Sequence, residues 1–494
     1  MLDSIAQGLA VIFQPGMMLA IFLATLGGII FGIIPGLNGM TFMAIFIPFT
    51  FGMDPYLAMS ILTAGYAVAV TGGSVTAVLV NVPGTGPNSA TLLDGFPMTQ
   101  QGQAGRALGA ALTASGLGGL EGGVILALLV PAVMPIVMAF GSPECFFLIV
   151  MGLSFIAALG QESKAKGMVS GLLGLLLSFV GYGPGTGFAR FTFGSTELLD
   201  GVKLIPCSLA IFGMPEMIAL MRSGRTIVKE GTEFRAPAAD IWEGAKDVFR
   251  HWWLHMRASA IGVFVGIVPG VGGDVAVWIA YGHAKTTSKH PETFGHGNVE
   301  GVIAPESANN SKEGGAMLTT LALGIPGSGA MAVLLGAFLI QGIQPGPAFL
   351  QEHLDLAFTI TGVLILTNLL GAAICMLIAP TLIKVTRIRS QLLAPFLLCI
   401  ITLGAYCYRN SISDVFVMFG LTVLGWAMRQ LGYSRPAFFL GFVLGGLAER
   451  YFNISMSSHG WKFFMTPISL VIIATTIISV SYQPMMVFLR KGKD

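Results

Sequence analysis

The sequence has 494 residues, of which 54% are hydrophobic and only 10% are charged. A chain of this length with so few charged residues lacks the polar surface that a water-soluble globular protein needs. The formal net charge is +2, and the basic residues lie in short loops, so the composition gives no indication of a nucleic-acid partner. Composition therefore predicts a polytopic protein of the lipid bilayer.

Long apolar runs predict membrane-spanning helices, because the hydrocarbon core leaves no partner for unpaired backbone groups. We expect an all-α polytopic protein with about 12 transmembrane helices. The clearest runs, in chain order, are 17–34, 56–70, 107–140, 145–159, 167–180, 204–221, 258–268, 356–383, 391–406, 415–428, 436–447 and 468–489.

Five shorter apolar runs fall below the ~20 residues that a full crossing requires. They cover residues 41–51, 75–82, 275–281, 317–325 and 330–341. These runs predict broken or re-entrant half-helices. The amino terminus lacks the basic region of a signal peptide, so we expect it to be retained.

Two distant parts of the chain share one pattern, in which an apolar run is broken by Pro-Gly and a later run by Pro-Gly-Thr/Ser-Gly. The pattern occupies Gly28–Thr41 with Gly72–Gly86, and again Gly262–Val275 with Gly314–Gly329. An internal duplication whose hydrophobic segments are interrupted at matching positions is typical of secondary transporters. The four paired breaks favour this interpretation over simple packing kinks.

The basic residues predict the orientation of the chain in the membrane. Lys and Arg cluster in five loops or tails that all lie on the cytoplasmic side if the spans alternate, and none occurs before Arg106. This places the amino terminus outside and the carboxyl terminus in the cytoplasm, and makes the two repeats inverted. We expect repeats at 1–221 (core 17–106) and 255–494 (core 258–347), joined by a cytoplasmic linker at 222–254.

Helix breaks inside a membrane offer an anion site without a charged side chain. Amides at a new helix amino terminus are unpaired and carry about half a positive charge, and glycines allow close approach to the backbone. For most of the residues below, a capping or turn role is an equally good interpretation. The predicted substrate-binding residues are Asn38, Gly39, Pro83, Gly84, Thr85, Asn88, Ser89, Asn309, Asn310, Pro326, Gly327 and Ser328.

A carboxylate inside a membrane-spanning segment is costly, so each such residue is a candidate functional residue. Asp274 directly follows the break PGVGG. We expect its carboxylate to form an ion-coupling site with the carbonyl groups that the helix breaks leave unpaired at Gly36 and Gly270. The coupling ion is Na⁺ or H⁺. Glu121 and Glu216 also lie deep, with either a coupling role or a partner on a neighbouring helix. The histidines and five cysteines show no metal-ligand spacing, so we expect no metal centre, no disulfide and no cofactor.

Several stretches resemble the TctA-type large membrane subunit of the tripartite tricarboxylate transporters. They are GIIPGLNGMT, GGSVTAVLVNVPGTG, TLLDGFPMTQQGQAGRALG, GIVPGVGGDVAVWIAY and the long segment Lys289–Pro347. The resemblance implies a secondary active symporter in the bacterial inner membrane that takes up di- or tricarboxylates. It also implies two partners, a small four-helix TctB-type subunit and a periplasmic TctC-type binding protein.

Two other function classes remain open from the sequence. An integral membrane enzyme acting on a lipid-linked substrate would use acids in TLLDGFPM or APESANN, although neither motif shows paired acids or metal-ligand spacing. A passive anion channel would require a polar stripe through the spans, which are almost wholly apolar apart from the breaks. We therefore predict a transporter and not an enzyme.

Overall fold

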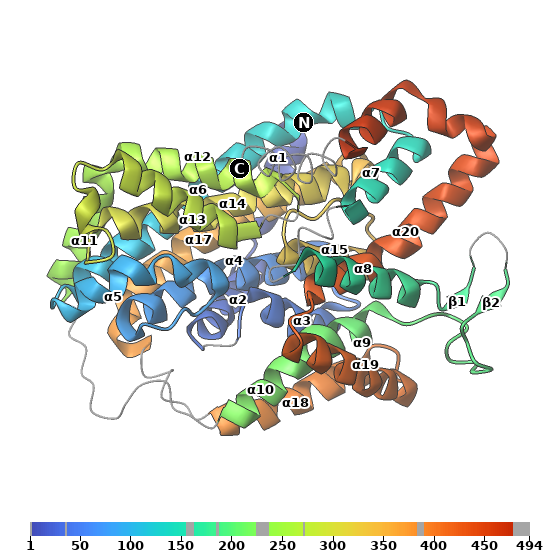
Figure 1. Ribbon diagram of the computed structural model, residues 1–494, viewed down its shortest axis with the longest axis horizontal. Coiled ribbons are helices and arrows are strands. Elements are labelled where there is room, and N and C mark those ends of the chain that lie inside the picture. Colours follow the sequence, from blue (N-terminus) through green and yellow to red (C-terminus); the bar gives the residue numbers. More distant parts are fainter. Residues whose placement is uncertain are drawn as a thin grey trace, which may run out of the picture.

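The computed structural model describes residues 2–34, 37–154, 163–183, 187–223, 237–269, 272–382 and 390–477. This part of the chain is almost entirely helical (Figure 1). A two-stranded antiparallel hairpin, β1 (Gly181–Tyr182) and β2 (Ala189–Arg190), projects at one end of the molecule. The all-helical membrane fold class predicted by the composition is confirmed.

The first half of the chain contains ten α-helices in the described residues. They are α1 (Leu2–Ile12), α2 (Pro15–Ile33), α3 (Gly39–Thr50), α4 (Pro55–Val80), α5 (Leu92–Gln100), α6 (Ala104–Val137), α7 (Ser142–Ser154), α8 (Lys164–Ser178), α9 (Leu204–Ser208) and α10 (Met214–Ser223). A 3-10 turn, η1 (Gly86–Ser89), precedes α5, and a π-helical segment, η3 (Leu209–Gly213), joins α9 to α10.

The second half contains ten labelled α-helices in the described residues. They are α11 (Ala238–Arg250), α12 (Trp252–Ile267), α13 (Gly272–Thr287), α14 (Glu300–Leu323), α15 (Gly329–Ile340), α16 (Pro347–Glu352), α17 (Leu354–Leu382), α18 (Ser390–Cys407), α19 (Ile412–Gln430) and α20 (Arg435–His459). The short turns η4 (Pro291–Thr293) and η6 (Gly460–Met465) and a further helix, Pro467–Ile477, complete the described elements.

Six helices in the described residues are long and apolar enough to cross a membrane, or up to seven if one bent pair counts as a single span. Helix α14 is 24 residues long but carries Glu306, Lys312 and Glu313, which makes it more polar than the others. The protein is thus a multi-pass membrane protein. The count of about 12 spans stays a prediction.

The sequence located the Pro-Gly interruptions correctly. Helix α2 ends at Ile33 and α3 begins at Gly39, while α12 ends at Ile267 and α13 begins at Gly272. Pro35, Gly36, Gly270 and Val271 themselves lie outside the described residues. The short run at 330–341 is also confirmed, as the 12-residue helix α15.

Two expected half-helices proved to be parts of longer helices. The runs 56–70 and 75–82 belong to one continuous helix, α4, because Gly72 and Gly73 continue it rather than break it. The run 317–325 is the last part of α14, which starts at Glu300 and includes the whole polar stretch before it. Both long helices end on a left-handed residue, Asn81 with φ 56° and Gly324 with φ 68°.

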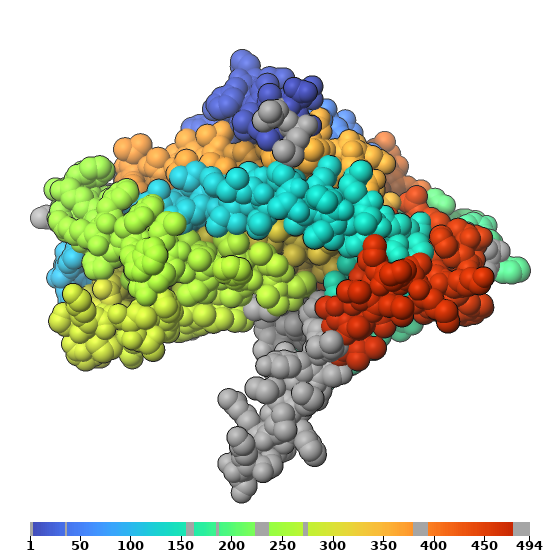
Figure 2. Space-filling view, turned by 90° about the horizontal axis from the view of Figure 1, so that it is seen from above, coloured from blue at the N-terminus to red at the C-terminus, as the bar shows by residue number. Residues whose placement is uncertain are grey.

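The helices of the two halves pack crosswise. The long helix α6 packs against α14, and its positional counterpart α17 packs against α4; likewise α11 packs on α6 and α1 on α17. Figure 2 shows α6 lying along one face of the molecule, with the amino-terminal helix beside the orange segment that contains α17. Each half therefore covers the central helices of the other.

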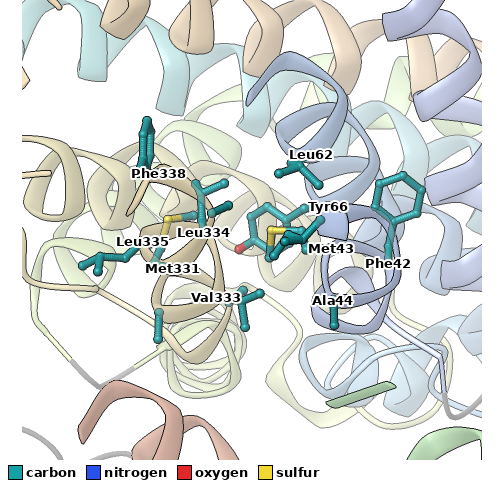
Figure 3. Packing of buried hydrophobic residues seen from close by; sticks show 14 of the residues in the cluster. Phe42, Met43, Ala44, Leu62, Tyr66, Met331, Val333, Leu334, Leu335 and Phe338 are labelled. Carbon is teal, nitrogen blue, oxygen red and sulfur yellow. The ribbon is translucent and has the colours of Figure 1, made fainter. Parts of the chain in front are cut away.

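Helices α4 and α14 form the centre of the protein. Within α4, 94% of the most apolar 18-residue window is buried, and residues 301–322 of α14 are all buried. Apolar side chains of α3, α4 and α15 pack together beside them, including Phe42, Leu62 and Phe338 (Figure 3). Polar groups on α4 and α14 are therefore enclosed by protein rather than exposed to lipid.

Candidate functional site

The predicted substrate residues Asn38 and Ser328 each cap a short helix. Asn38 Oδ1 accepts hydrogen bonds from the Thr41 amide at 3.0 Å and the Thr41 hydroxyl at 3.2 Å, at the start of α3. Ser328 Oγ accepts from the Met331 amide at 3.3 Å, at the start of α15. Capping groups of this kind fix where a helix begins.

The two capped helix ends lie next to each other. A Cβ placed on Gly329, the first residue of α15, would be 3.5 Å from Sδ of Met40 in the first turn of α3, and the two helices pack together. Helix amino termini carry partial positive charge, so their approach favours an anion between or beside them. The structure thus joins the first break of one half with the second break of the other.

The loop of the first half holds itself together through Thr85 and Asn88. Asn88 Oδ1 accepts from the Thr85 hydroxyl at 2.5 Å and the Thr85 amide at 3.2 Å, while Nδ2 donates to Ser74 Oγ at 2.9 Å and the Val70 carbonyl at 3.2 Å. Asn88 is fully buried. In this conformation its amide group anchors the loop to α4.

The rest of this loop is more open than the matching loop of the second half. Pro83 and the flanking Asn81 and Gly86 are exposed, whereas Pro326 and Gly327 are buried. Ser89 is half-buried and donates its hydroxyl to the Gly86 carbonyl at 2.7 Å. The two halves therefore differ in the access that solvent or lipid has to the second break.

Gly84 and Gly327 are packed against backbone. A Cβ on Gly84 would lie 2.3 Å from Cα of Gly73 and 2.4 Å from the carbonyl oxygen of Gly32. A Cβ on Gly327 would lie 2.7 Å from Cα of Ala316 and from the carbonyl oxygen of Gly266. These glycines allow three chain segments to meet, so close backbone packing explains their presence in this conformation.

A row of polar side chains on α14 faces α4. Residues three, four and seven positions apart share one face of a helix, as Glu306, Asn310 and Glu313 do. Glu306 accepts from Ser74 of α4, the Asn310 amide donates to Thr71 of the same helix at 2.9 Å, and Glu313 accepts from Tyr66. We call this row the α4–α14 seam.

One end of the seam carries a buried ion pair. The Lys312 ammonium donates to Glu313, which also accepts from the Tyr66 hydroxyl, and all three residues are buried. The Ser328 side chain, at the start of α15, lies close to the Tyr66 hydroxyl. Figure 3 shows the Tyr66 ring between Met43 of α3 and Leu334 of α15. The ion pair and Tyr66 therefore lie beside the capped helix end.

The other end of the seam is a carboxylate enclosed by hydroxyl groups. Glu306 is fully buried and accepts from Ser115 at 2.6 Å, Thr91 at 2.6 Å and Ser74 at 2.8 Å. The Asn88 amide approaches it at 3.5 Å. Four elements, α4, α5 with its preceding turn, α6 and α14, thus meet at this carboxylate.

Unpaired polar atoms lie between the two ends. Among the residues that the structure describes, the buried side-chain polar atoms of Asn309 and the Oδ1 of Asn310 have no hydrogen-bond partner. The Asn310 amide is satisfied by Thr71 and by Asn368 Oδ1 at 2.6 Å. Buried unpaired polar atoms are rare in native proteins and indicate a place for water, an ion or a ligand. Both asparagines were predicted as substrate residues.

Asp274 occupies the first turn of α13, and its side chain lies outside the described residues. The other two carboxylates considered from the sequence have partners. Glu121 is 3.0 Å from His255 Nε2, and Glu216 contacts Arg435 at 2.8 Å and Arg429 at 3.5 Å. Among the described residues, no three His, Cys, Asp or Glu side chains come together as a metal site.

Asp94, from the TLLDGFPM motif, is a buried anchor for the loop between α13 and α14. It accepts from the Tyr281 hydroxyl at 2.9 Å and from the amides of Gly295 at 2.9 Å, Gly297 at 3.0 Å and Asn298 at 2.8 Å. A carboxylate with four donors around it is held in one position. The acid of APESANN, Glu306, is enclosed in the same way.

Sequence reasoning missed Tyr66, Lys312 and Glu313, and it considered Glu306 only as an acid of the alternative enzyme function. Tyr66 lies in an apolar run, and the segment of the other three was interpreted as a polar stretch that precedes a short apolar run. The spacing of Glu306, Asn309, Asn310 and Glu313 is the signal that was available, since it places them on one face of a helix.

These features define a multi-pass helical membrane protein with polar groups enclosed where interrupted helices meet. The family model of the tripartite tricarboxylate transporter TctA family matches residues 18–440. The chain belongs to this family, and it is thereby a component of a tripartite transport system.

Two relatives from Agrobacterium vitis are similar to this chain. One is described as an uncharacterized 52.8 kDa protein in the TAR-I ttuC′ 3′ region; it is 32% identical over 488 residues, which cover 97% of this chain and 95% of the relative. The other, an uncharacterized protein in the TAR-II ttuC′ 3′ region, is 34% identical over 195 residues, or 40% of this chain and 81% of the relative. No solved structure matches.

Proposed function

We propose that this protein is the permease of an ion-gradient-driven system that takes up di- or tricarboxylates across the bacterial inner membrane. It receives the acid from a periplasmic TctC-type binding protein and works with a small TctB-type subunit. The amino terminus lies outside and the carboxyl terminus in the cytoplasm. Family membership supports the transport class, and the site supports an anionic cargo.

The observation that carries the proposal is the group of buried polar atoms at the seam, beside two capped helix ends. Asn309 Nδ2 is a donor with no partner among the described residues, α3 and α15 present their amino termini, and Lys312 supplies a buried cation that is shared with Glu313. A carboxylate that binds here gains charge-assisted hydrogen bonds in a region where an unpaired ion is costly.

The crosswise packing of α6 on α14 and α17 on α4 supports two inverted repeats, 1–221 and 255–494, with the linker at 222–254. Two such units give similar conformations that face opposite sides, which is the basis of alternating access around a central site. Each break then belongs to a mobile contact between the repeats.

For the coupling ion we propose Asp274 with carbonyl groups near Gly36 and Gly270 as a site for Na⁺ or H⁺. The Asp274→Asn variant should lose accumulation driven by that ion, because an amide carries no negative charge to balance a cation. Uptake that keeps its cation dependence in this variant would contradict the coupling role.

The experiment that tests the function is reconstitution of the permease with its small subunit and a binding protein in liposomes. Uptake of labelled di- and tricarboxylates is measured under imposed Na⁺ or pH gradients. Gradient-driven accumulation that requires the binding protein supports the proposal. Downhill flux alone would favour a passive anion channel. Absence of flux for every acid would reopen the substrate class and, after it, the membrane-enzyme alternative.

A further inference from the structure

Glu306 is a buried carboxyl group whose hydrogen-bond partners are uncharged side chains. Within the described part of the chain no salt bridge reaches it, although Glu216 and Glu313 elsewhere in the protein are paired with cations. An unpaired charge in a dry interior is costly, and a buried carboxyl avoids that cost by binding a proton. Glu306 is therefore placed to change its charge rather than to keep it.

The hydroxyl groups around Glu306 suit both protonation states. With the carboxylate, Ser74, Thr91 and Ser115 all donate to its oxygens. Ser74 has a second acceptor, the Val70 carbonyl, at 3.3 Å. When Glu306 is protonated, the Ser74 hydrogen turns to Val70 and the Ser74 oxygen accepts the new carboxylic O–H. Oxygen distances of 2.6–2.8 Å are hydrogen-bond distances, which favour a proton over a metal ion.

In the described part of the chain, none of the titratable side chains on the packed helices hydrogen-bonds to Glu306, whose partners are uncharged hydroxyl and amide groups. The charged and titratable groups on these elements include Tyr56 and Tyr66 on α4, Asp94 on α5, Arg106 and Glu121 on α6, His255 and Arg257 on α12, Asp274, Tyr281, His283 and Lys285 on α13, and Glu300, Lys312 and Glu313 on α14. His255 contacts the residue next to Glu306, since its Nδ1 is 2.6 Å from Ser307 Oγ. It is bound to Ser307 and Glu121 rather than to Glu306.

The Asn88 side chain connects Glu306 to the Pro-Gly-Thr-Gly loop. Asn88 Nδ2 donates to Ser74, the hydroxyl that must turn on protonation, and to Val70, the carbonyl it turns toward. The other end of the same amide holds Thr85. Protonation or deprotonation of Glu306 therefore alters the hydrogen bonds that hold the Pro-Gly-Thr-Gly loop on α4. Pro83 and Gly86 are exposed, so this loop has room to move away from α4.

We propose that Glu306 binds and releases one proton in each transport cycle, and that Asn88 couples this step to the loop at Pro83–Gly86. Uptake of H⁺ converts the carboxylate to the carboxylic acid, and release restores the three hydroxyl hydrogen bonds. The inference rests on the proposed transport function and adds a proton site that is separate from Asp274.

The test compares Glu306→Gln with wild type in liposomes that contain the complete transporter. Two rates are measured, exchange of labelled for unlabelled carboxylate across the membrane and net accumulation driven by a pH gradient. Glutamine mimics the neutral acid in size and hydrogen bonding, so exchange should stay within about threefold of wild type and lose its pH dependence. Each coupled proton supports about tenfold accumulation per pH unit, and that contribution should disappear.

Glu144→Gln is the matched control. Glu144 is also buried and accepts from two hydroxyls, Thr466 at 2.6 Å and Ser469 at 3.3 Å, and from the Gly141 amide at 2.9 Å, but it lies away from the seam. This variant should keep both exchange and proton-driven accumulation. Ser74→Ala is the second test, since it keeps the carboxyl but removes the donor that turns; the pH profile of exchange should move to higher pH.

Unchanged proton-driven accumulation in Glu306→Gln, or an unchanged pH profile in Ser74→Ala, would overturn the inference. So would loss of exchange together with accumulation in a correctly folded Glu306→Gln protein, because Glu306 would then serve the cargo site or the packing. If wild type exchanges no carboxylate at all, the proposed function fails before the proton site is tested.

Discussion

Gly84→Ala separates two roles for the glycine in the Pro-Gly-Thr-Gly loop. If the glycine serves an anion that approaches the backbone, a methyl group should reduce uptake and leave stability intact. If it serves packing, stability should fall as well. The structure favours packing, because the added Cβ would lie 2.3 Å from Gly73 Cα and 2.4 Å from the Gly32 carbonyl oxygen.

The size of the effect follows from these distances. Carbon atoms pack at about 3.5–4.0 Å, so the contact is short by more than an ångström, and the atoms that must move belong to backbone. Overpacking of this kind costs about 1–3 kcal/mol or more. Gly327→Ala meets Ala316 and Gly266 at 2.7 Å and should cost less than Gly84→Ala.

The measurement is the free energy of unfolding in mixed micelles, together with carboxylate exchange in liposomes. Gly282→Ala in α13 is the control, because its Cβ would meet no atom within 4 Å; it should be neutral or stabilise by up to about 1 kcal/mol. A Gly84→Ala protein with unchanged unfolding free energy and abolished exchange would refute the packing argument and restore the anion role.

Two further substitutions test the hydrogen bonds of the site and its surroundings. Tyr66→Phe removes the hydroxyl that donates to Glu313, which should lower the unfolding free energy by about 1.5–3 kcal/mol and weaken carboxylate binding in equilibrium titrations; unchanged values would mean that the bond does not contribute. Asp94→Asn leaves fewer acceptor positions for three amides, so hydrogen exchange at residues 295–298 should accelerate, with the exposed Glu292→Gln as a control that leaves it unchanged.

Apolar helices were predictable because hydropathy determines which segments enter the membrane. The run at 17–34 corresponds to α2, and the run at 107–140 to α6, which spans Ala104–Val137. The start of α14 was not predictable in the same way. Its polar residues pair with groups on α4 and α6, and a hydropathy pattern cannot distinguish a polar residue in water from one that is hydrogen-bonded inside the protein.

The candidate site was predictable only where its chemistry is local. Asn38 and Ser328 lie at helix starts that the Pro-Gly motifs mark in the sequence. Glu306 is different, because its partner Ser74 is 232 positions away and no local pattern connects them. Gly84 shows a third case, in which the motif was found but the neighbours that explain it, Gly32 and Gly73, required the fold.

The crosswise arrangement of α6 on α14 and α17 on α4 also constrains biosynthesis. When α6 leaves the ribosome, α14, which will pack against it, has not yet been translated. Helices α6 and α4 therefore lie in the bilayer without their partners until the second half is made. Contacts of such long sequence separation form late. The two halves expressed as separate polypeptides should therefore be degraded singly and accumulate only when they are made together.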